Sequence, residues 1–287
     1  MASLLARLSP PSFHPERDMP DLSGRIVLVT GGNTGIGYET VKQLLLKNAK
    51  LDLADFPSVR KAVQTFLAQE PRLDLLFNNG GVMISPPEML TAQGYDLQFG
   101  TNCIGHFFLT ELLLPALLKS HAETGIRARI MHTSSIGHNL APGKRGIEFE
   151  SLKGGPERDA WVKKAGKTMG PWRIYGESKF GNILVANHFA NKYGDALVST
   201  SLHPGGIKTE LGRYSGSFLN LASDILGYPA PMGAYTQLWG ATVADGEAIN
   251  GKYLVPWGKL GKADPRSADK MLENEVIAYL QQQVKGF

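Results

Sequence analysis

A tyrosine and a lysine in the second half of the chain have the spacing of a proton-transfer pair. Tyr175 and Lys179 are four positions apart, so a helix would place them on one face. A free tyrosine has a pKa of about 10 and is a poor base at neutral pH, whereas a nearby ammonium favours the phenolate. Tyr175 could then exchange a proton with a substrate hydroxyl or carbonyl. An exposed Tyr–Lys pair on a helix surface is the alternative without chemistry.

A glycine-rich turn near the N-terminus could hold a phosphate. Residues 30–37 read T-G-G-N-T-G-I-G, between a β-branched run and a helical pattern. Glycines permit close backbone approach, and a helix N-terminus adds unpaired N–H groups and a favourable dipole. The spacing differs from the G-x-G-x-x-G of most dinucleotide sites. A turn that only packs a helix on a strand is therefore the alternative.

Other polar residues follow predicted strands, at the sheet edge where open α/β sheets bind ligands. The Ser135 hydroxyl could hold a substrate oxygen as charge develops, or could only cap the end of its strand. The amides of Asn79 and Gly80 could line the ribose side of a cofactor, or could only form a tight turn. Asn102, inside a predicted helix, could hold a water or could only kink that helix.

Strand-like and helix-like patterns alternate along the chain. The alternation predicts an α/β fold, a Rossmann-type doubly wound parallel sheet of about six strands in three αβα layers. The predicted strands cover residues 25–30, 51–54, 73–77, 129–133, 196–202 and 252–255. The predicted helices cover residues 36–46, 57–69, 94–118, 171–193 and 232–242, with a last helix from about residue 267. Residues 137–171 show poor periodicity and are interpreted as an inserted loop.

The domain organisation follows from the same patterns. Residues 22–287 are predicted to form a single domain, because no repeat or shift of composition marks a second one. Residues 1–21 are rich in proline and are interpreted as a loose N-terminal arm. Residues 206–232 carry many apolar side chains without a strong pattern, which indicates a lid that favours a hydrophobic substrate. Simple cover for the core is the alternative.

Composition narrows the class of protein. The 287 residues are 43% hydrophobic and 20% charged, with a net charge of +4. The basic residues are scattered rather than gathered in a stripe with aromatics, which argues against nucleic-acid binding. No uncharged apolar run approaches the roughly 20 residues of a membrane span, and the histidines lack metal-ligand spacing. A single cysteine, Cys103, fits a reducing compartment, so we expect a cytoplasmic protein without a metal site.

Taken together, these motifs resemble the classical short-chain dehydrogenase/reductase family over about residues 22–260. Residues 30–37 match the family's T-G-x-x-x-G-I-G, and residues 78–81 resemble its N-N-A-G, with Gly80 in place of alanine. The catalytic tetrad is matched by Asn102, Ser135, Tyr175 and Lys179. Pro204-Gly205 with Thr209 resembles the P-G segment that wraps the nicotinamide.

The resemblance implies an NAD(P)-dependent oxidoreductase that interconverts an alcohol and a carbonyl by hydride transfer, with Tyr175 as general acid/base. The N-N-G-G variant is most similar to retinol-dehydrogenase-like members, which favours NADP(H) and leaves NAD(H) open. A small, hydrophobic substrate and a homo-dimer or homo-tetramer are expected by analogy. The implied cofactor-binding residues are Gly31, Asn33, Gly35, Ile36, Gly37, Asp52, Leu53, Asn79, Gly80, Tyr175, Lys179, Pro204, Gly205, Ile207 and Thr209.

One departure from the family pattern follows residue 50. About one strand–helix unit, on the order of 25 to 30 residues, is missing there. In the family the missing strand ends in the residue that reads the adenosine ribose. Asp52 or Asp55 could replace that residue if residues 51–54 move into the vacant strand position. We therefore hypothesise that the part of the fold that carries the catalytic residues is intact, whereas the part that binds the adenosine of the cofactor is damaged.

The departure also supports a rival interpretation. A truncated family member could be catalytically impaired or inactive and serve as a nucleotide-binding or protein-binding module. The four matched tetrad residues argue against this alternative.

Overall fold

The computed structural model describes residues 11–44, 53–208, 211, 214 and 227–287. Its sheet has six strands in the order β1-β2-β3-β4-β5-β6, of which the first five are parallel. Their bounds are β1 Val27–Val29, β2 Leu75–Asn78, β3 Ala128–Thr133, β4 Leu197–Leu202, β5 Tyr253–Val255 and β6 Lys259–Leu260. The predicted α/β fold with about six strands is confirmed.

The sixth strand is not the expected one. The short strand β6 pairs antiparallel with β5. Of the strand expected at residues 51–54, Leu51 and Asp52 lie outside the described residues, and Leu53 and Ala54 form a turn. The turn leads into the capped start of a helix at Asp55. In the described part of the chain, β1 is therefore an edge strand that pairs only with β2.

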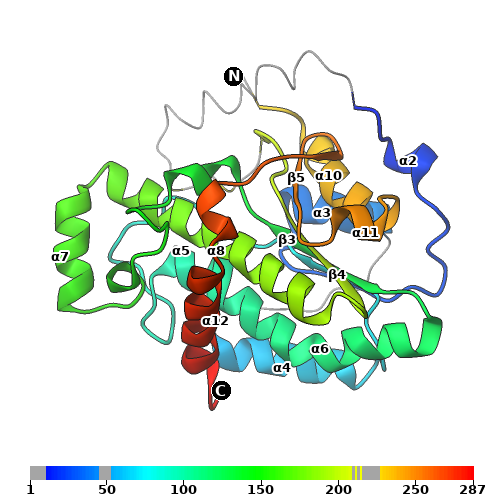
Figure 1. Ribbon diagram of the computed structural model, residues 1–287, viewed down its shortest axis with the longest axis horizontal. Coiled ribbons are helices and arrows are strands. Elements are labelled where there is room, and N and C mark those ends of the chain that lie inside the picture. The colour runs from blue at the N-terminus through cyan, green and yellow to red at the C-terminus, as the bar shows by residue number, and fades with distance from the viewer. Residues whose placement is uncertain (1–10, 45–52, 209–210, 212–213, 215–226) are drawn as a thin grey trace.

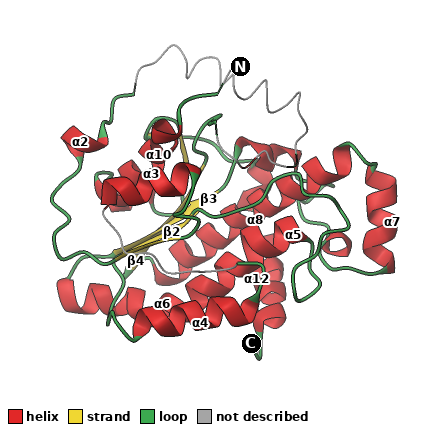
Figure 2. Cartoon of the chain, turned by 180° about the vertical axis from the view of Figure 1, so that it is seen from behind, coloured by secondary structure: helices red, strands yellow, loops and turns green. Residues whose placement is uncertain are grey.

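Helices cover both faces of the sheet and complete the three layers (Figure 1). On one face lie α4 Phe56–Leu67, α6 Gly105–Thr124, α8 Met169–Tyr193 and α12 Lys270–Val284. On the other face lie α3 Gly35–Leu44, α10 Ala230–Thr242 and the short α11 Gly246–Ile249. The view from behind in Figure 2 shows α3 and α10 side by side in front of the strands. The short α5 Leu97–Phe99 comes before α6, and 3-10 turns cover Ile136–Leu140, Phe149–Ser151 and Pro265–Ala268.

The largest apolar cluster lies on the face covered by α4, α6, α8 and α12. Val59 of α4, Leu113 of α6 and Phe180 of α8 are fully buried members of this cluster. By length and composition, the helical run Leu97–Thr124 could cross a membrane. However, 72% of its most apolar stretch is buried inside the fold. This run therefore has the character of a core helix.

Two further segments differ from expectation. The region interpreted as an inserted loop contains α7 Pro156–Ala165, which begins at a proline suited to a first turn. This helix lacks an apolar face, so no periodicity reveals it; Arg158 anchors it through a buried ion pair of 2.5 Å with Asp96. Residues 11–21 of the expected arm contain α2 Pro15–Asp18. They are held by Phe13, which is buried against Tyr235 of α10.

Candidate active site

Helix α8 carries the predicted proton-transfer pair into the interior. Tyr175 and Lys179 are each 3% exposed, so they are not a surface pair. The Lys179 ammonium donates a hydrogen bond of 2.9 Å to the carbonyl of Thr133, the last residue of β3. It lies 5.8 Å from the centroid of the Tyr175 ring. The helix therefore places both groups at the carboxyl end of the central strand.

Burial changes the expected electrostatics of this pair. It raises the pKa of Tyr175 to about 12, and a hydrogen bond with the Ser135 side chain opposes that shift. It also lowers the pKa of Lys179 to about 8. The sequence predicted a phenol acidified by the lysine, but here desolvation dominates. At neutral pH the phenol keeps its proton.

Ser135 lies at the end of β3, as predicted, and faces the phenol. It caps the 3-10 turn Ile136–Leu140, and its Oγ accepts a 3.0 Å hydrogen bond from the N–H of Gly137. A Cβ added at Gly137 would lie 2.9 Å from Cε1 of Tyr175, so only glycine leaves room for the ring. The hydroxyl of Ser135 therefore lies beside the phenol of Tyr175. Ser135 both caps the 3-10 turn and occupies the predicted catalytic position.

Asn102 occupies a π-helical turn, Gly100–Ile104, between α5 and α6. Its side-chain amide pairs with the backbone of Val82, accepting from the N–H at 2.9 Å and donating to the carbonyl at 2.9 Å. It also donates to Ser178 Oγ at 3.0 Å, and that hydroxyl donates to the carbonyl of Tyr175. The single extra residue of a π turn re-aims side chains and is common at functional sites. Asn102 thus links the turn after β2 to α8.

The glycine turn connects β1 to α3. Gly31 and Gly35 have positive φ of 66° and 54°, which an L side chain rarely adopts. A Cβ added at Gly37 would lie 2.2 Å from the carbonyl oxygen of Gly31, so tight helix–strand packing also requires glycine. Gly31 and Asn33 are exposed, and Ile36 is half-buried. The first N–H groups of a ten-residue helix therefore border an accessible turn.

A threonine ties the glycine turn to the turn after β2. Thr30 Oγ1 accepts hydrogen bonds from the N–H of Asn79 at 2.9 Å and of Gly80 at 2.8 Å. The Asn79 side chain donates to the carbonyl of Thr30 at 3.0 Å. A Cβ at Gly80 would lie 3.1 Å from Cδ1 of the buried Leu53, which explains glycine where the family has alanine. Leu53 packs behind this turn.

His106 is a buried residue that sequence reasoning missed. Its Nε2 lies 2.8 Å from Thr30 Oγ1, and its Nδ1 lies 3.0 Å from the carbonyl oxygen of Asn102. Burial lowers the pKa of His106 to about 3, so the ring is neutral and carries one N–H. That N–H is at Nδ1, because the carbonyl can only accept, so Nε2 accepts from Thr30. His106 follows Asn102 by four residues, so a helix would place the two side by side. That spacing was the sequence signal from which this contact could have been predicted.

The other predicted cofactor residues are two at the end of β4, one that packs near the glycine turn, and two outside the described residues. Pro204 is buried and Gly205 has a φ of 105°. Ile207 meets Ile36 at Gly233 of α10, where an added Cβ would lie 3.0 Å and 2.6 Å from them, so the segment after β4 borders the glycine turn. Asp52 and Thr209 lie outside the described residues, as do residues 209–210, 212–213 and 215–226 of the expected lid.

Asp55, the other candidate for binding a ribose, is already hydrogen-bonded within the fold. Its carboxylate caps α4 by accepting from the N–H of Ser58 at 3.2 Å. It also accepts from the side chain of Gln93 at 3.2 Å. The proposed movement of Asp55 toward a vacant strand position is therefore not seen, because N-capping holds this residue at the start of α4.

Comparisons with known proteins agree with this geometry. The sequence profile of the short chain dehydrogenase family matches residues 46–146. A short-chain dehydrogenase/reductase of Armillaria gallica is 40% identical over 319 aligned positions, covering 99% of this chain and 98% of the relative. The chain belongs to the short-chain dehydrogenase/reductase family. Retinol dehydrogenase 11 of Mus musculus is 35% identical, covering 68% of this chain and 65% of its own length.

Solved structures show the same fold. An uncharacterized protein from Mycobacterium paratuberculosis superposes on this short-chain dehydrogenase/reductase with a TM-score of 0.69 at 25% identity, covering 95% of this chain and 97% of that one. A carbonyl reductase from chicken fatty liver, solved with NADPH, has a TM-score of 0.58 at 21% identity, covering 83% of this chain and 99% of that one. The second likeness supports the fold alone.

The comparisons also bear on the missing unit. The alignment with the Armillaria relative spans 319 positions, whereas this chain has 287 residues. At least about 30 aligned positions therefore have no counterpart in this chain, a number that agrees with the size of the strand–helix unit predicted to be missing.

Proposed function

We propose that this short-chain dehydrogenase/reductase interconverts an alcohol and a carbonyl on a small, hydrophobic substrate, with Tyr175 as general acid/base. The observation that carries the proposal is the meeting of Tyr175, Ser135 and Lys179 at the carboxyl end of β3. The glycine turn after β1 lies at the same edge of the sheet. Open α/β sheets bind ligands at this edge.

The residues at this edge fit a nicotinamide dinucleotide. The exposed glycine turn and the first N–H groups of α3 suit a pyrophosphate, and the turn has the backbone freedom that close approach requires. An ammonium can donate three hydrogen bonds, and the Thr133 carbonyl takes one from Lys179, so this group also suits ribose hydroxyls. When bound, the nicotinamide would supply or accept the hydride. The kinship with retinol dehydrogenases favours NADP(H), with NAD(H) as the other candidate.

The state of Tyr175 favours carbonyl reduction at neutral pH. A pKa raised to about 12 keeps the proton on the phenol, ready for donation to a substrate carbonyl oxygen. Ser135 Oγ lies beside that phenol and can donate a second hydrogen bond to the same oxygen as negative charge develops. The carbonyl carbon gains the hydride and the oxygen gains the Tyr175 proton, which gives the alcohol.

Apolar side chains next to Ser135 support a hydrophobic substrate. Ile136 and Leu140 of the 3-10 turn that Ser135 caps are 54% and 41% exposed. Large exposed apolar groups beside a polar centre are typical of a binding site for an apolar molecule. We also propose a cytoplasmic location, which rests on the single buried Cys103, and a homo-oligomer, which rests on family analogy.

The test is an absorbance assay at 340 nm with NADPH or NADH and a panel of aliphatic and aromatic aldehydes and ketones. Tyr175→Phe should lower kcat at least 100-fold, because it removes the donated proton while keeping the ring packing. Cofactor binding, followed by NADPH fluorescence, should stay within about threefold of the parent. A folded parent that binds neither cofactor and reduces nothing would overturn the proposal and favour the inactive, truncated alternative.

A further inference from the structure

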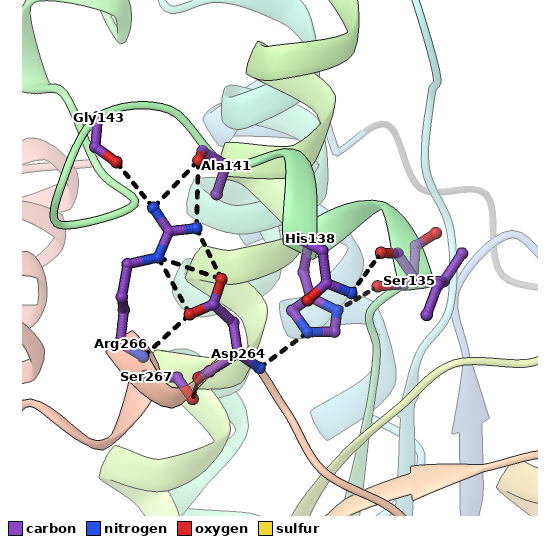
Figure 3. A network of polar contacts seen from close by, with 9 residues as sticks. Ser135, His138, Ala141, Gly143, Asp264, Arg266 and Ser267 are labelled. Atoms are coloured by element: carbon purple, nitrogen blue, oxygen red, sulfur yellow. Dashed lines mark hydrogen bonds and ion pairs between the residues drawn. The ribbon is translucent and has the colours of Figure 1, made fainter. Parts of the chain in front are cut away.

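A segment far from Ser135 in the sequence lies against the 3-10 turn that Ser135 begins. Asp264 and the following turn Pro265–Ala268 come after β6, near the C-terminus. Figure 3 shows this segment beside residues 135–143, with His138 and Arg266 reaching across from opposite sides. The two segments are therefore joined by side chains at both ends of the turn Ile136–Leu140.

His138 makes the first connection and has one tautomer. Its Nε2 lies 3.0 Å from the backbone nitrogen of Asp264, and its Nδ1 lies 2.6 Å from the carbonyl oxygen of Ser135. The amide of Asp264 can only donate, so Nε2 accepts. Nδ1 then carries the proton and donates to Ser135, whose carbonyl can only accept. The ring is buried, and burial lowers the pKa of His138, so this neutral form persists at physiological pH.

Tyr253 of β5 supports the same ring from the side. Its hydroxyl lies 3.3 Å from His138 Nδ1, and the two ring centroids are 5.0 Å apart in an edge-on arrangement. The phenol also hydrogen-bonds the side chain of Ser134. Ser134 Oγ in turn donates to the carbonyl of Lys179 at 2.7 Å. The two serines after β3 are thereby tied to α8 and to the C-terminal segment.

Arg266 makes the second connection. Its guanidinium pairs with the Asp264 carboxylate in a two-pronged arrangement, with contacts of 3.0 Å from Nε and 2.7 Å from Nη2. It also donates to the carbonyls of Ala141 at 3.2 Å and Gly143 at 2.9 Å. Bidentate pairing with Asp264 fixes the orientation of the planar guanidinium group, so Arg266 holds both Asp264 and the far end of the turn.

We propose that His138 is a positioning residue for Ser135, held in place by Asp264 and Arg266. Ser135 is half-exposed and lies where β3 ends, so its strand no longer restrains it. The backbone N–H of His138 also donates to the Ser135 carbonyl, at 3.1 Å. The side-chain bond from Nδ1 adds to it, and together the two bonds fix the peptide from which Oγ points at Tyr175. The inference rests on the proposed function, since positioning has meaning only if Ser135 contacts the substrate.

The test separates the two bonds of His138 by isosteric replacement. In His138→Asn the amide N–H occupies the place of Nδ1 and keeps the bond to Ser135; in His138→Gln the oxygen reaches the place of Nε2 and keeps the bond to Asp264. His138→Leu loses both. A displacement of about 1 Å at a catalytic group can cost on the order of 100-fold in rate. We expect kcat to fall 10-fold to 100-fold in the Leu and Gln variants and less than 5-fold in the Asn variant.

A positioning role should leave ground-state binding alone. KM for the carbonyl and Kd for NADPH should stay within about threefold in all three variants, because Ser135 acts mainly on the oxygen in the transition state. In the parent, 15N NMR of the imidazole should show a proton on Nδ1 and none on Nε2. The Asp264 amide should exchange slowly with solvent in the parent and in His138→Gln, and faster in His138→Asn.

Matched controls keep the inference separate from stability and from the proposed function. Asn139→Ala removes another side-chain hydrogen bond of the same turn, to the carbonyl of Ile136 at 3.0 Å, and should keep kcat within twofold. Arg266→Lys keeps the charge but loses the fork, and should lower kcat in the same direction as His138→Leu. If Ser135→Ala is inactive while every His138 variant matches the parent, the positioning role is wrong and the proposed function stands. If Ser135→Ala matches an active parent, Ser135 does not act on the substrate oxygen and the positioning role is wrong, while the assignment of Tyr175 still depends on Tyr175→Phe.

Discussion

At the scale of single residues, burial decides the chemistry of the site more than pairwise charge does. The ammonium of Lys179 lies near the ring of Tyr175, yet desolvation raises the pKa of the phenol to about 12. The same burial lowers the pKa of Lys179 to about 8. Both groups are therefore less ionised than on a surface, which prepares Tyr175 to give a proton rather than to take one.

This protonation state predicts a different pH dependence for each direction of the reaction. Between pH 6 and pH 8 the phenol stays protonated, so kcat for carbonyl reduction should change less than about twofold. Alcohol oxidation needs the phenolate, whose fraction rises tenfold per pH unit below its pKa, so its kcat should rise steeply over the same range. Initial rates at 340 nm in both directions would measure this. A flat profile for oxidation would show that Tyr175 is not the base.

At the scale of elements, buried polar contacts place helices that lack apolar faces. Asp96 caps α5 by accepting from the N–H groups of Gln98 and Phe99, and it also pairs with Arg158 of α7. Both partners of the pair are almost fully buried. Because α5 leads directly into the π turn of Asn102, this ion pair supports the site as well as α7.

Breaking this pair should therefore be costly. Arg158→Met leaves the Asp96 carboxylate buried without its cation, and such a loss costs about 3–5 kcal/mol of the free energy of unfolding. Lys163→Met, at an exposed position of the same helix, should cost less than about 0.5 kcal/mol. Urea unfolding followed by circular dichroism would compare the two. A cost below about 1 kcal/mol for Arg158→Met would mean that Asp96 is solvated or protonated in the native state.

At the scale of the whole molecule, the described sheet ends at β1. Only ten residues separate the end of α3 at Leu44 from the cap at Asp55. A parallel crossover alone needs roughly 10–12 residues, so these ten are too few for a further strand together with its crossover. The doubly wound order places two more strands beyond the first one, where the adenosine half of a dinucleotide binds. The glycine turn after β1 and the carboxyl end of β3, where Ser135 and Tyr175 meet, lie among the described residues.

The hypothesis of a damaged adenosine half can be measured without a substrate. If the strand that selects between the two cofactors has been lost, the parent should bind NADPH and NADH with Kd values within about fivefold of each other. Both should bind more weakly than to a family member that contains the strand–helix unit, in the same fluorescence titration. Tight binding of one dinucleotide, at least 50-fold stronger than the other, would contradict the hypothesis.

The buried histidines predict a second property of the whole molecule. Burial lowers the pKa of His106 and His132 to about 3 and that of His203 to about 4. Between their ordinary pKa of about 6.5 and these values the unfolded chain binds more protons than the native one, so stability falls as the pH falls. From pH 7.5 to pH 5 the free energy of unfolding should drop by on the order of 2 kcal/mol per histidine.

Urea unfolding at several pH values would measure this drop. His132→Gln should make the dependence shallower, because one buried titrating group is gone. An unchanged pH dependence in His132→Gln would mean that this ring binds its proton in the native state as readily as in the unfolded chain.

The sequence by itself determined the alternation of strands and helices, the family, and the residues that could do chemistry. The spacing of hydrophobic residues, the glycines and the Tyr175–Lys179 spacing are local features of the sequence. The local geometry of helices and strands determines which side chains share a face. The expected position of Ser135 and of the glycine turn at one sheet edge followed from strand order alone. The pattern could not reveal α7, because an ion pair rather than an apolar face holds it.

Only the tertiary structure decided the state and the support of those residues. The proton on Tyr175 depends on how much water the fold removes, and that depends on side chains from several distant segments. His106 and His138 gain their partners from positions far away in the chain. Hydrogen bonds and desolvation act through space over a few ångströms, so a linear pattern cannot show them, whereas the packed fold brings Thr30 to His106 and Asp264 to His138.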